Sequence, residues 1–173
     1  MVLVSFLISI IGIGFPFLFS KKVEHSWQNI SSYIHISIDG MKGKEEDVLL
    51  TLQIPSIGLE EDVYNINSEF NQVQYHVQIL MDSNLEKNLF FLAAHSGSGK
   101  ASYFNQLIHM KVGDVVWIYY QEKLLCFQVE EIFYISKKGY FEIPLADSYN
   151  KLFLITCSLD YPDKQLSVKA SLV

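Results

Sequence analysis

Short apolar runs separated by polar turns dominate the chain from residue 47 onward. Val48–Ile54, Leu59–Tyr64 and Val115–Tyr120 are rich in β-branched and aromatic side chains and are bounded by turn residues, which is typical of β-strands. The same pattern predicts further strands over residues 89–94, 124–135, 152–156 and 165–172. Residues 103–108 instead show apolar positions at helical spacing. Many short strands with little helix indicate a mainly β fold, namely a closed barrel with short helices.

The first 20 residues are uncharged and almost entirely apolar, and this is about the length that a bilayer-spanning helix needs. A surface helix would show a polar side, whereas this stretch is apolar on every face. No small-residue cleavage site follows it, so we predict an uncleaved membrane anchor rather than a signal peptide. The lysines at positions 21 and 22 would, by the positive-inside rule alone, keep the rest of the chain in the cytoplasm. We give this bias of two charges little weight.

Three regions follow from this reading of the chain. Residues 1–20 are the predicted N-terminal transmembrane helix, residues 21–46 are a polar juxtamembrane stalk, and residues 47–173 are the β-barrel. The chain has 173 residues, half of them hydrophobic, which suits one compact domain better than two. The net charge is −6 and the sequence contains no arginine. Nucleic-acid binding is therefore not expected, because phosphate contacts need a basic face.

The sequence contains two cysteines, Cys126 and Cys157. Two are too few for a disulfide framework or a zinc-ligand pattern, although a single bridge stays open. Cys126 lies inside a predicted strand, and we interpret it as a core packing residue. No histidine spacing indicates a metal site, and we expect no cofactor. The paired acids at 60–61 and 130–131 are expected to be solvated strand residues.

His95 and Cys157 each stand where an apolar predicted strand meets a polar loop. A rigid scaffold often presents reactive groups at such positions. A thiol beside an imidazole can exist partly as the nucleophilic thiolate, and the imidazolium can then protonate a departing amine. Spacing alone does not establish this pair, because a lone histidine is more often a hydrogen-bonded structural residue and a lone cysteine is more often an inert buried one.

Three segments carry a resemblance to a known family. They are Leu52–Ile57 (LQIPSI), Phe91–Gly97 (FLAAHSG) and Leu154–Cys157 (LITC). In order and spacing they resemble the sortases, across all of the chain beyond the predicted anchor and stalk. The resemblance implies an eight-stranded β-barrel that works as a cysteine transpeptidase, with Cys157 as nucleophile and His95 as general acid and base.

The resemblance also implies the partners and the location. The substrates would be secreted proteins with a C-terminal sorting signal, often of the Leu-Pro-x-Thr-Gly kind. Cleavage would leave a thioester on Cys157, and the acyl group would pass to an amine of a peptidoglycan precursor or of a pilin. The protein would be a single-pass protein of the cell membrane with its catalytic domain outside the cell. Some sortases bind calcium through loop carboxylates, so the resemblance leaves calcium as an open alternative to the expected lack of a cofactor.

One feature departs from the family pattern, because sortases normally carry an arginine at the start of the last strand. Aligning the alternating apolar residues of that strand places Gln165 at the arginine position, while Lys164 lies one residue away and faces the other side of the pleat. Gln165 is therefore the candidate third catalytic residue, and Lys164 is the alternative. Both could also be ordinary solvated residues at the start of a strand.

The missing arginine keeps two other functions open. One is a catalytically silent sortase fold that binds sorting-signal peptides or pilus subunits. The other is a cysteine peptidase that releases the acyl group to water instead of transferring it to an amine.

Overall fold

Eight β-strands and four short 3-10 helices make up the part of the chain that the computed structural model describes, residues 47–138 and 142–173. The strands are β1 (Val48–Ile54), β2 (Leu59–Tyr64), β3 (Gln78–Ile79), β4 (Leu89–Ala93), β5 (Val115–Tyr120), β6 (Lys123–Ser136), β7 (Lys151–Cys157) and β8 (Lys164–Leu172). The helices are η1 (Pro55–Ile57), η2 (Leu85–Lys87), η3 (Asn105–His109) and η4 (Leu145–Asp147). The prediction of a mainly β fold with short helices is confirmed.

The predicted anchor, residues 1–20, and the stalk, residues 21–46, lie outside the described residues. Within the described ranges, no helix is both long enough and apolar enough to cross a membrane.

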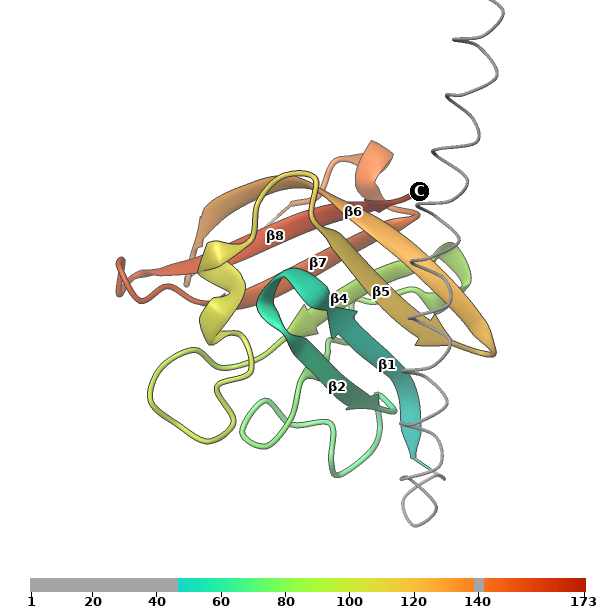
Figure 1. The fold of residues 1–173 in the computed structure, drawn as a ribbon, viewed down its shortest axis with the longest axis horizontal. Helices are drawn as coiled ribbons and strands as arrows, with labels where there is room; N and C mark the ends of the chain where they lie inside the picture. The colour runs from blue at the N-terminus through green and yellow to red at the C-terminus, as the bar shows by residue number, and fades with distance from the viewer. Residues whose placement is uncertain (1–46, 139–141) are drawn as a thin grey trace, which may run out of the picture. The chain divides into compact units, whose positions relative to one another are not determined.

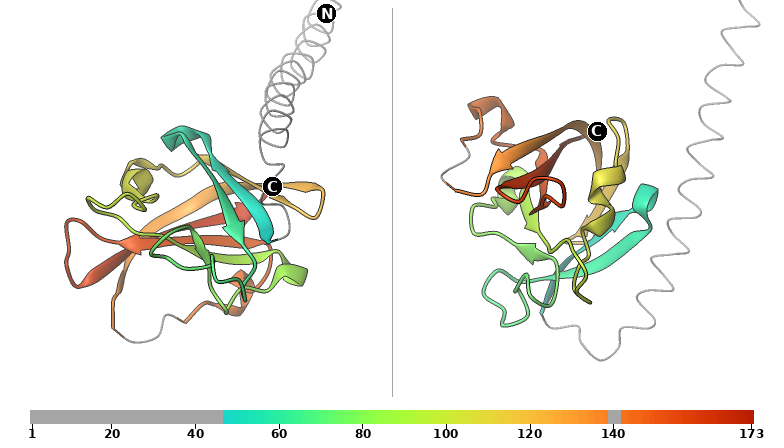
Figure 2. Two further views of the ribbon diagram at one scale, coloured as in Figure 1. Left: turned by 90° about the horizontal axis from the view of Figure 1, so that it is seen from below. Right: turned by 90° about the vertical axis from the view of Figure 1, so that its left-hand side faces the viewer.

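All eight strands belong to one sheet, in the order β2-β1-β5-β6-β8-β7-β4-β3. Neighbouring strands are antiparallel except for β4 and β7, which run parallel. Val63 of β2 and Val77, which directly precedes β3, form an isolated bridge that joins the two ends of this order. The sheet is therefore nearly closed into a barrel, and its strands curve around a common interior (Figures 1 and 2).

Alternate positions along each strand point into the barrel and form its core. In β1, Leu50, Leu52 and Ile54 are buried, while the positions between them are only partly buried. Phe90 of β4 meets Phe127 of β6 edge to face, with ring centroids 5.9 Å apart. Burying a large apolar side chain of this kind contributes about 1.5–3 kcal/mol. The alternation also determines which side chains face outward, where the candidate site lies.

None of the predicted strand ends differs from the observed end by more than one residue. β1, β2 and β5 have the predicted bounds, whereas β4 ends at Ala93 and β7 extends to include Cys157. Cys157 is therefore the last residue of a strand rather than the first residue of a loop. The helical spacing at 103–108 corresponds to the 3-10 helix η3, which begins at Asn105.

The interpretation of Cys126 as a core packing residue is wrong. Cys126 lies directly opposite Trp117 across the β5–β6 pair, and the side chains that enter the core from this part of β6 are those of its neighbours Leu125 and Phe127. Cys126 is half-buried on the outward side, where burial raises the pKa of its thiol. Both cysteines are free thiols, so the open alternative of a single bridge is excluded.

Candidate active site

The parallel pairing of β4 and β7 brings together two residues that are far apart in the sequence. Ala93 of β4 pairs with Ile155 of β7, and the next amide, Ala94 N–H, donates to the Ile155 carbonyl at 3.2 Å. His95 and Cys157 each follow this pair by two residues, so the register brings both of them to the same end of the sheet. Adjacent strands in a sheet lie about 4.8 Å apart.

Side-chain hydrogen bonds fix the chain on both sides of this pair. The Thr156 hydroxyl donates to the Ala94 carbonyl at 2.8 Å, and the Ser96 hydroxyl donates to the Cys157 carbonyl at 2.5 Å. Each bond joins a neighbour of one candidate residue to the other strand. The ends of β4 and β7 are therefore held together where the strand ladder finishes.

The loop that follows His95 is also held in place. The Phe104 amide donates to the His95 carbonyl at 3.1 Å. Asn105 accepts from the Gly97 amide at 2.5 Å and donates to the Gly97 carbonyl at 2.7 Å. Gly97 has a φ of +126°, a conformation that side chains disfavour and glycine tolerates.

Gln165 of β8 lies directly opposite Cys157 in the antiparallel β7–β8 pair. Directly opposed residues of such a pair project from the same face of the sheet, so Gln165 shares the outward face of Cys157. Lys164 is one residue away and projects to the other side, where its Nζ lies 5.2 Å from the centre of the Tyr161 ring. The two candidates for the third catalytic position thus occupy different environments.

The outward face beside Cys157 is largely apolar. Leu89 and Phe91 of β4 and Phe153 of β7 are buried there and pack against partly buried residues, which are Leu80, Phe133, Ile143 and Ile155. The Phe91 and Phe153 rings stack at 4.8 Å. We call the outer side of β4, β7, β8 and β6 that carries this cluster the outer apolar face. Cys157 lies at one end of it.

Ser167 contributes a polar group to the outer apolar face. It lies opposite Ile155 of β7 and opposite Phe133 of β6, and it is 1% exposed. Its hydroxyl is the buried side-chain polar atom that has no hydrogen-bond partner within the described part of the chain.

An open pocket of about 420 Å³ lies on the loop side of His95. Its lining comes from the connection between β2 and β3 and from the loop after β4, and consists of Gln74, Tyr75, His95, Ser96, Gly99, Lys100, Ala101, Ser102 and Tyr103. The pocket lining contains neither Cys157 nor an acidic residue. His95 is exposed, and it is the candidate catalytic residue that the pocket reaches.

The expectation that the acids at 60–61 are solvated is wrong for Glu61. Glu61 pairs with Leu52, a core residue, and lies between Leu59 and Val63 on the inward side of β2. Burial, together with the charges of Asp62 and Glu60, raises its pKa to about 7. Strict alternation along β2 would have shown this inward position.

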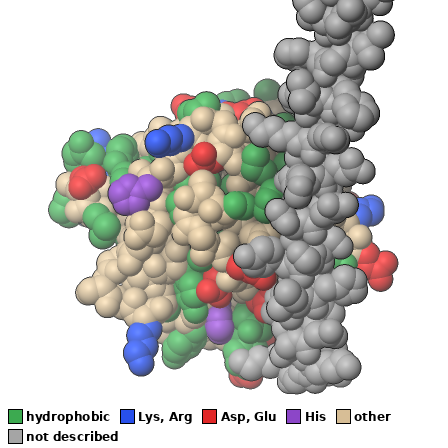
Figure 3. Space-filling model, viewed as in Figure 1, with side chains coloured by type: hydrophobic (Ala, Val, Ile, Leu, Met, Phe, Trp, Pro, Cys, Tyr) green, Lys and Arg blue, Asp and Glu red, His purple; other side chains and the backbone are tan. Residues whose placement is uncertain are grey.

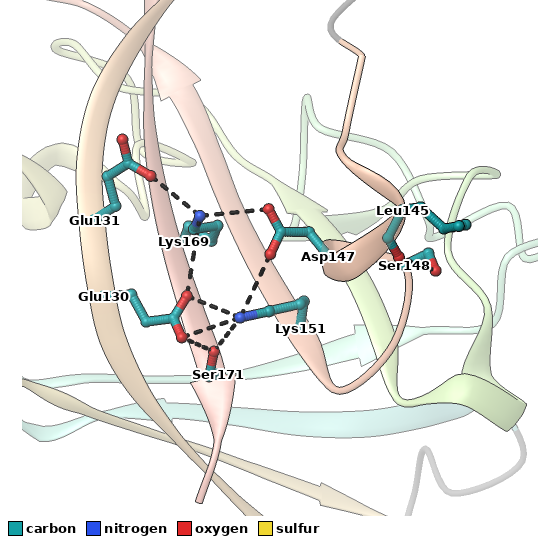
Figure 4. A network of polar contacts seen from close by, with 8 residues as sticks. All are labelled: Glu130, Glu131, Leu145, Asp147, Ser148, Lys151, Lys169 and Ser171. Carbon is teal, nitrogen blue, oxygen red and sulfur yellow. Dashed lines mark hydrogen bonds and ion pairs between the residues drawn. The ribbon is translucent and has the colours of Figure 1, made fainter.

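The acids at 130–131 are exposed, as expected, but they take part in a network of ion pairs (Figure 4). Lys151 Nζ lies 2.9 Å from Glu130 and 3.5 Å from Asp147, and Lys169 Nζ lies 3.1 Å from Glu131 and 3.4 Å from Asp147. The two lysine side chains are only 15% and 17% exposed. Asp147 therefore ties η4, in the connection between β6 and β7, to the outer surface of β7 and β8.

On the face shown in Figure 3, lysine side chains stand apart from one another and form no continuous basic patch among the described residues. No group of three or more histidine, cysteine or acidic side chains within residues 47–138 and 142–173 is arranged to hold a metal ion.

The fold and the site together define a class of protein, a β-barrel that carries a thiol and an imidazole at the ends of two neighbouring parallel strands. A family model described as the sortase domain matches residues 52–173. The chain therefore belongs to the sortase family, whose members are cysteine transpeptidases, and the predicted resemblance is confirmed.

Solved structures agree with this assignment at the level of the fold. Sortase C of Streptococcus pneumoniae is 23% identical, with a TM-score of 0.62 over 75% of this chain and 70% of that one. A lid mutant of sortase A from Corynebacterium diphtheriae is 22% identical, with a TM-score of 0.61 over 77% and 74%. Sortase C-1 of Actinomyces oris is 22% identical, with a TM-score of 0.61 over 75% and 76%. None of the curated proteins matches the chain.

Proposed function

We propose that this protein is a sortase-type transpeptidase that cleaves a C-terminal sorting signal through a thioester on Cys157 and transfers the acyl group to an amine. The observation that carries the proposal is the parallel β4–β7 register, which brings the strand ends that precede His95 and carry Cys157 to the same end of the sheet. Family membership supports the general chemistry. The residues and substrates named below are part of the proposal.

In the first step, the Cys157 thiolate attacks the carbonyl carbon of the scissile peptide bond. A carbon–sulfur bond forms and the carbon–nitrogen bond breaks, while the His95 imidazolium gives its proton to the departing amine. In the second step, an acceptor amine attacks the thioester, His95 takes the proton of that amine, and the thiolate leaves. This chemistry needs no cofactor.

The outer apolar face is the proposed binding surface for the sorting signal. It leads along β4 and β7 to Cys157. Its apolar side chains are buried in this structure, and they would suit an extended peptide with apolar residues ahead of the scissile bond once the segments that cover them move aside. Ser167 lies on this face and would offer a hydrogen bond to the peptide once its neighbours move aside.

Gln165 is the proposed donor to the oxyanion that forms during attack. Its position opposite Cys157 on the same face supports this role, whereas Lys164 is engaged with the Tyr161 ring. An amide carries no charge, so it stabilises the oxyanion less than an arginine would. Loss of one oxyanion donor typically costs about two to three powers of ten in rate.

The structural relatives guide the choice of substrates. The work on sortase C of Streptococcus pneumoniae concerns its pilin substrate specificity, so a pilin and a peptidoglycan precursor are both proposed acceptors. We further propose that residues 1–20 anchor the protein as a single span in the cell membrane and that the barrel acts outside the cell.

The experiment uses the full-length chain in detergent with quenched fluorescent peptides that carry varied sorting signals, with and without an amine acceptor. The proposal predicts cleavage that the acceptor accelerates and that Cys157→Ala and His95→Ala abolish. A cleavage rate that the acceptor does not change would favour the peptidase. Equal fluorescence signals from the wild-type protein and Cys157→Ala would favour the catalytically silent sortase fold.

Gln165→Ala and Lys164→Ala form a matched pair in the same assay. We expect Gln165→Ala to lower turnover about 100-fold while its melting temperature stays near that of the wild type. Lys164→Ala should change turnover little. The reverse ranking would assign the third position to Lys164.

A further inference from the structure

Two lysines carry positive charge on the outward side of β7 and β8 (Figure 4). Lys169 lies directly opposite Phe153 of β7, and Lys151 is the first residue of that strand. Opposed residues share a face, and side chains alternate along a strand, so both lysines project from the same side as Phe153 and Cys157. They therefore continue the outer apolar face at the end that lies away from Cys157.

The distance from Cys157 tells which part of a donor peptide could meet the lysines. A strand rises about 3.3 Å per residue, so Lys169 lies about 13 Å and Lys151 about 20 Å from Cys157 along β7. An extended peptide with its scissile bond at Cys157 would bring the fifth to seventh residues ahead of that bond to this region. A scissile bond inside a five-residue signal leaves at most four residues of the signal ahead of it. The lysines would therefore meet the chain that precedes the signal.

The acidic partners of the two lysines differ in how firmly the fold holds them. Glu130 and Glu131 belong to β6, and their contacts with the lysines measure 2.9 Å and 3.1 Å. Asp147 belongs to the three-residue helix η4, which lies outside the sheet. Its carboxylate lies 3.5 Å from Lys151 Nζ and 3.4 Å from Lys169 Nζ, farther than the 2.7–2.9 Å or so of a strong charge-assisted hydrogen bond. Asp147 is therefore the partner that another carboxylate could most readily replace.

The connection that carries Asp147 also covers the outer apolar face. Ile143 packs against the apolar cluster of this face, in which Phe153 is 1% exposed. A donor peptide could lie on the face only if residues 142–148 moved aside. The same movement would take the Asp147 carboxylate away from both lysines, which are partly buried. Loss of an anion from a partly buried ammonium is costly.

Segment 143–147 thus places on the face the two kinds of group that a bound donor could supply. Ile143 provides an apolar side chain on the apolar cluster, and Asp147 provides a carboxylate that bridges two ammonium groups. Each ammonium has three N–H donors, so one glutamate does not saturate it. A carboxylate of the donor would restore the bridge that Asp147 gives up, whereas an amide or an ammonium would not.

We propose that Lys151 and Lys169 form a subsite for an acidic side chain in the donor, located in the chain just ahead of its sorting signal. The donor carboxylate replaces that of Asp147 when the peptide binds. This inference rests on the proposed transpeptidation, and it names a feature of the donor that the signal itself does not contain.

A binding assay on full-length Cys157→Ala in detergent tests the subsite without catalysis. Three fluorescent peptides share the signal Leu-Pro-Ala-Thr-Gly. The first has three Asp directly ahead of the signal, the second has three Asn there, and the third has three Asn ahead and three Asp behind. Fluorescence anisotropy should give the first peptide a Kd about tenfold below those of the other two, because hydrogen bonds between charged groups are the stronger ones.

Substitution of the lysines in the same protein assigns the preference to them. Lys151→Met and Lys169→Met should each remove most of the preference for the first peptide. The Kd of the second peptide should stay near its starting value, which shows that the face is still folded. Lys169→Arg keeps the charge and should keep the preference. Lys111→Met alters an exposed lysine outside the face and is the matched control.

Three results would overturn the subsite. They are equal Kd values for the first two peptides, equal Kd values for the first and third peptides, and a preference that survives in both methionine variants. Absence of binding by all three peptides would overturn it as well. A thioester on the wild-type protein without this preference would leave the proposed function standing. The preference without any thioester would support the subsite and contradict the proposed function.

Discussion

Glu61 shows how a single residue responds to its place in the barrel. It faces inward from β2 opposite Leu52, where burial and the neighbouring acids Asp62 and Glu60 raise its pKa to about 7. The ordinary pKa of a glutamate is 4.5, so between about pH 4.5 and pH 7 the folded state holds a proton that the unfolded chain has released. The stability that this proton provides is present below pH 4.5 and is lost as the pH rises through 7.

We predict that Glu61→Gln stabilises the protein at pH 8 and has little effect at pH 4.5. The expected gain in the free energy of unfolding at pH 8 is about 1 kcal/mol, a modest figure because Glu61 is only half-buried and solvent screens its charge. Urea denaturation at several pH values measures it, with the exposed Glu69→Gln as control. A gain of the same size at both pH values would show that Glu61 does not titrate in this range.

The sequence alone predicts the position of some residues in the barrel but not of others. His95 and Cys157 stand out because each follows an apolar run within a motif, and Gln165 was placed by simple alternation along the last strand. Glu61 was missed because it lies in a run of three acids, which looks solvated although the middle one faces inward. The prediction that Cys126 packs in the core was wrong because the residues before and after it in the strand are also apolar. The sequence alone therefore does not show which of them face the core, whereas the pairing with Trp117 does.

At the scale of elements, a β-bulge makes the ion-pair network possible. The β6–β8 register shifts between Val129 and Glu131, and such a bulge lets two consecutive residues project toward the same side. Hydrogen bonds from Ser171 and Lys151 lower the pKa of Glu130. Burial works against the charged form of Lys169, but its contacts with Glu131 and Asp147 outweigh burial and raise its pKa. Glu130 and Lys169 therefore both stay charged across the neutral pH range.

Asp147 is the member of the network that belongs to η4, and Asp147→Asn should loosen the connection between β6 and β7. We expect the free energy of unfolding to fall by about 1 kcal/mol at low salt, because both lysines lose a partner in a partly buried setting. The loss should shrink in 1 M salt, which screens the ion pairs of the wild type. Urea denaturation at the two salt concentrations checks this.

Glu142→Gln is the control for this change, since Glu142 is an exposed acid in the same connection. Equal stabilities for Asp147→Asn and Glu142→Gln would mean that the ion pairs of Asp147 contribute nothing measurable.

Elements could be predicted from the sequence more readily than their contacts. Alternation and turn residues predicted every strand except β3, which has only two residues and so shows no pattern of its own. The ion pairs could not be predicted, since they depend on a bulge and on how η4 folds back onto β7 and β8. The apolar spacing at 103–108 predicted a helix, and the structure has the short 3-10 helix η3 there. Phe104 and Leu107 are both buried within this one turn.

At the scale of the whole molecule, the site depends on one unusual feature of the topology. The sheet is antiparallel apart from the β4–β7 pair, and only a parallel pair brings the carboxyl ends of two strands to the same edge. Local sequence patterns carry no information on this pairing order. The family resemblance predicts it, and the strand register gives the physical reason why His95 and Cys157 lie at the same edge of the sheet.

The central claim of this account is that Cys157 forms a thioester with the sorting-signal peptide. Intact-mass spectrometry of the full-length protein, incubated with donor peptides and no acceptor, measures this directly. The account predicts an added mass equal to the acyl part of the peptide, present in Cys126→Ser, absent in Cys157→Ala, and released by hydroxylamine. An adduct that survives in Cys157→Ala, or no adduct with any donor from a broad set of sorting signals, would contradict it.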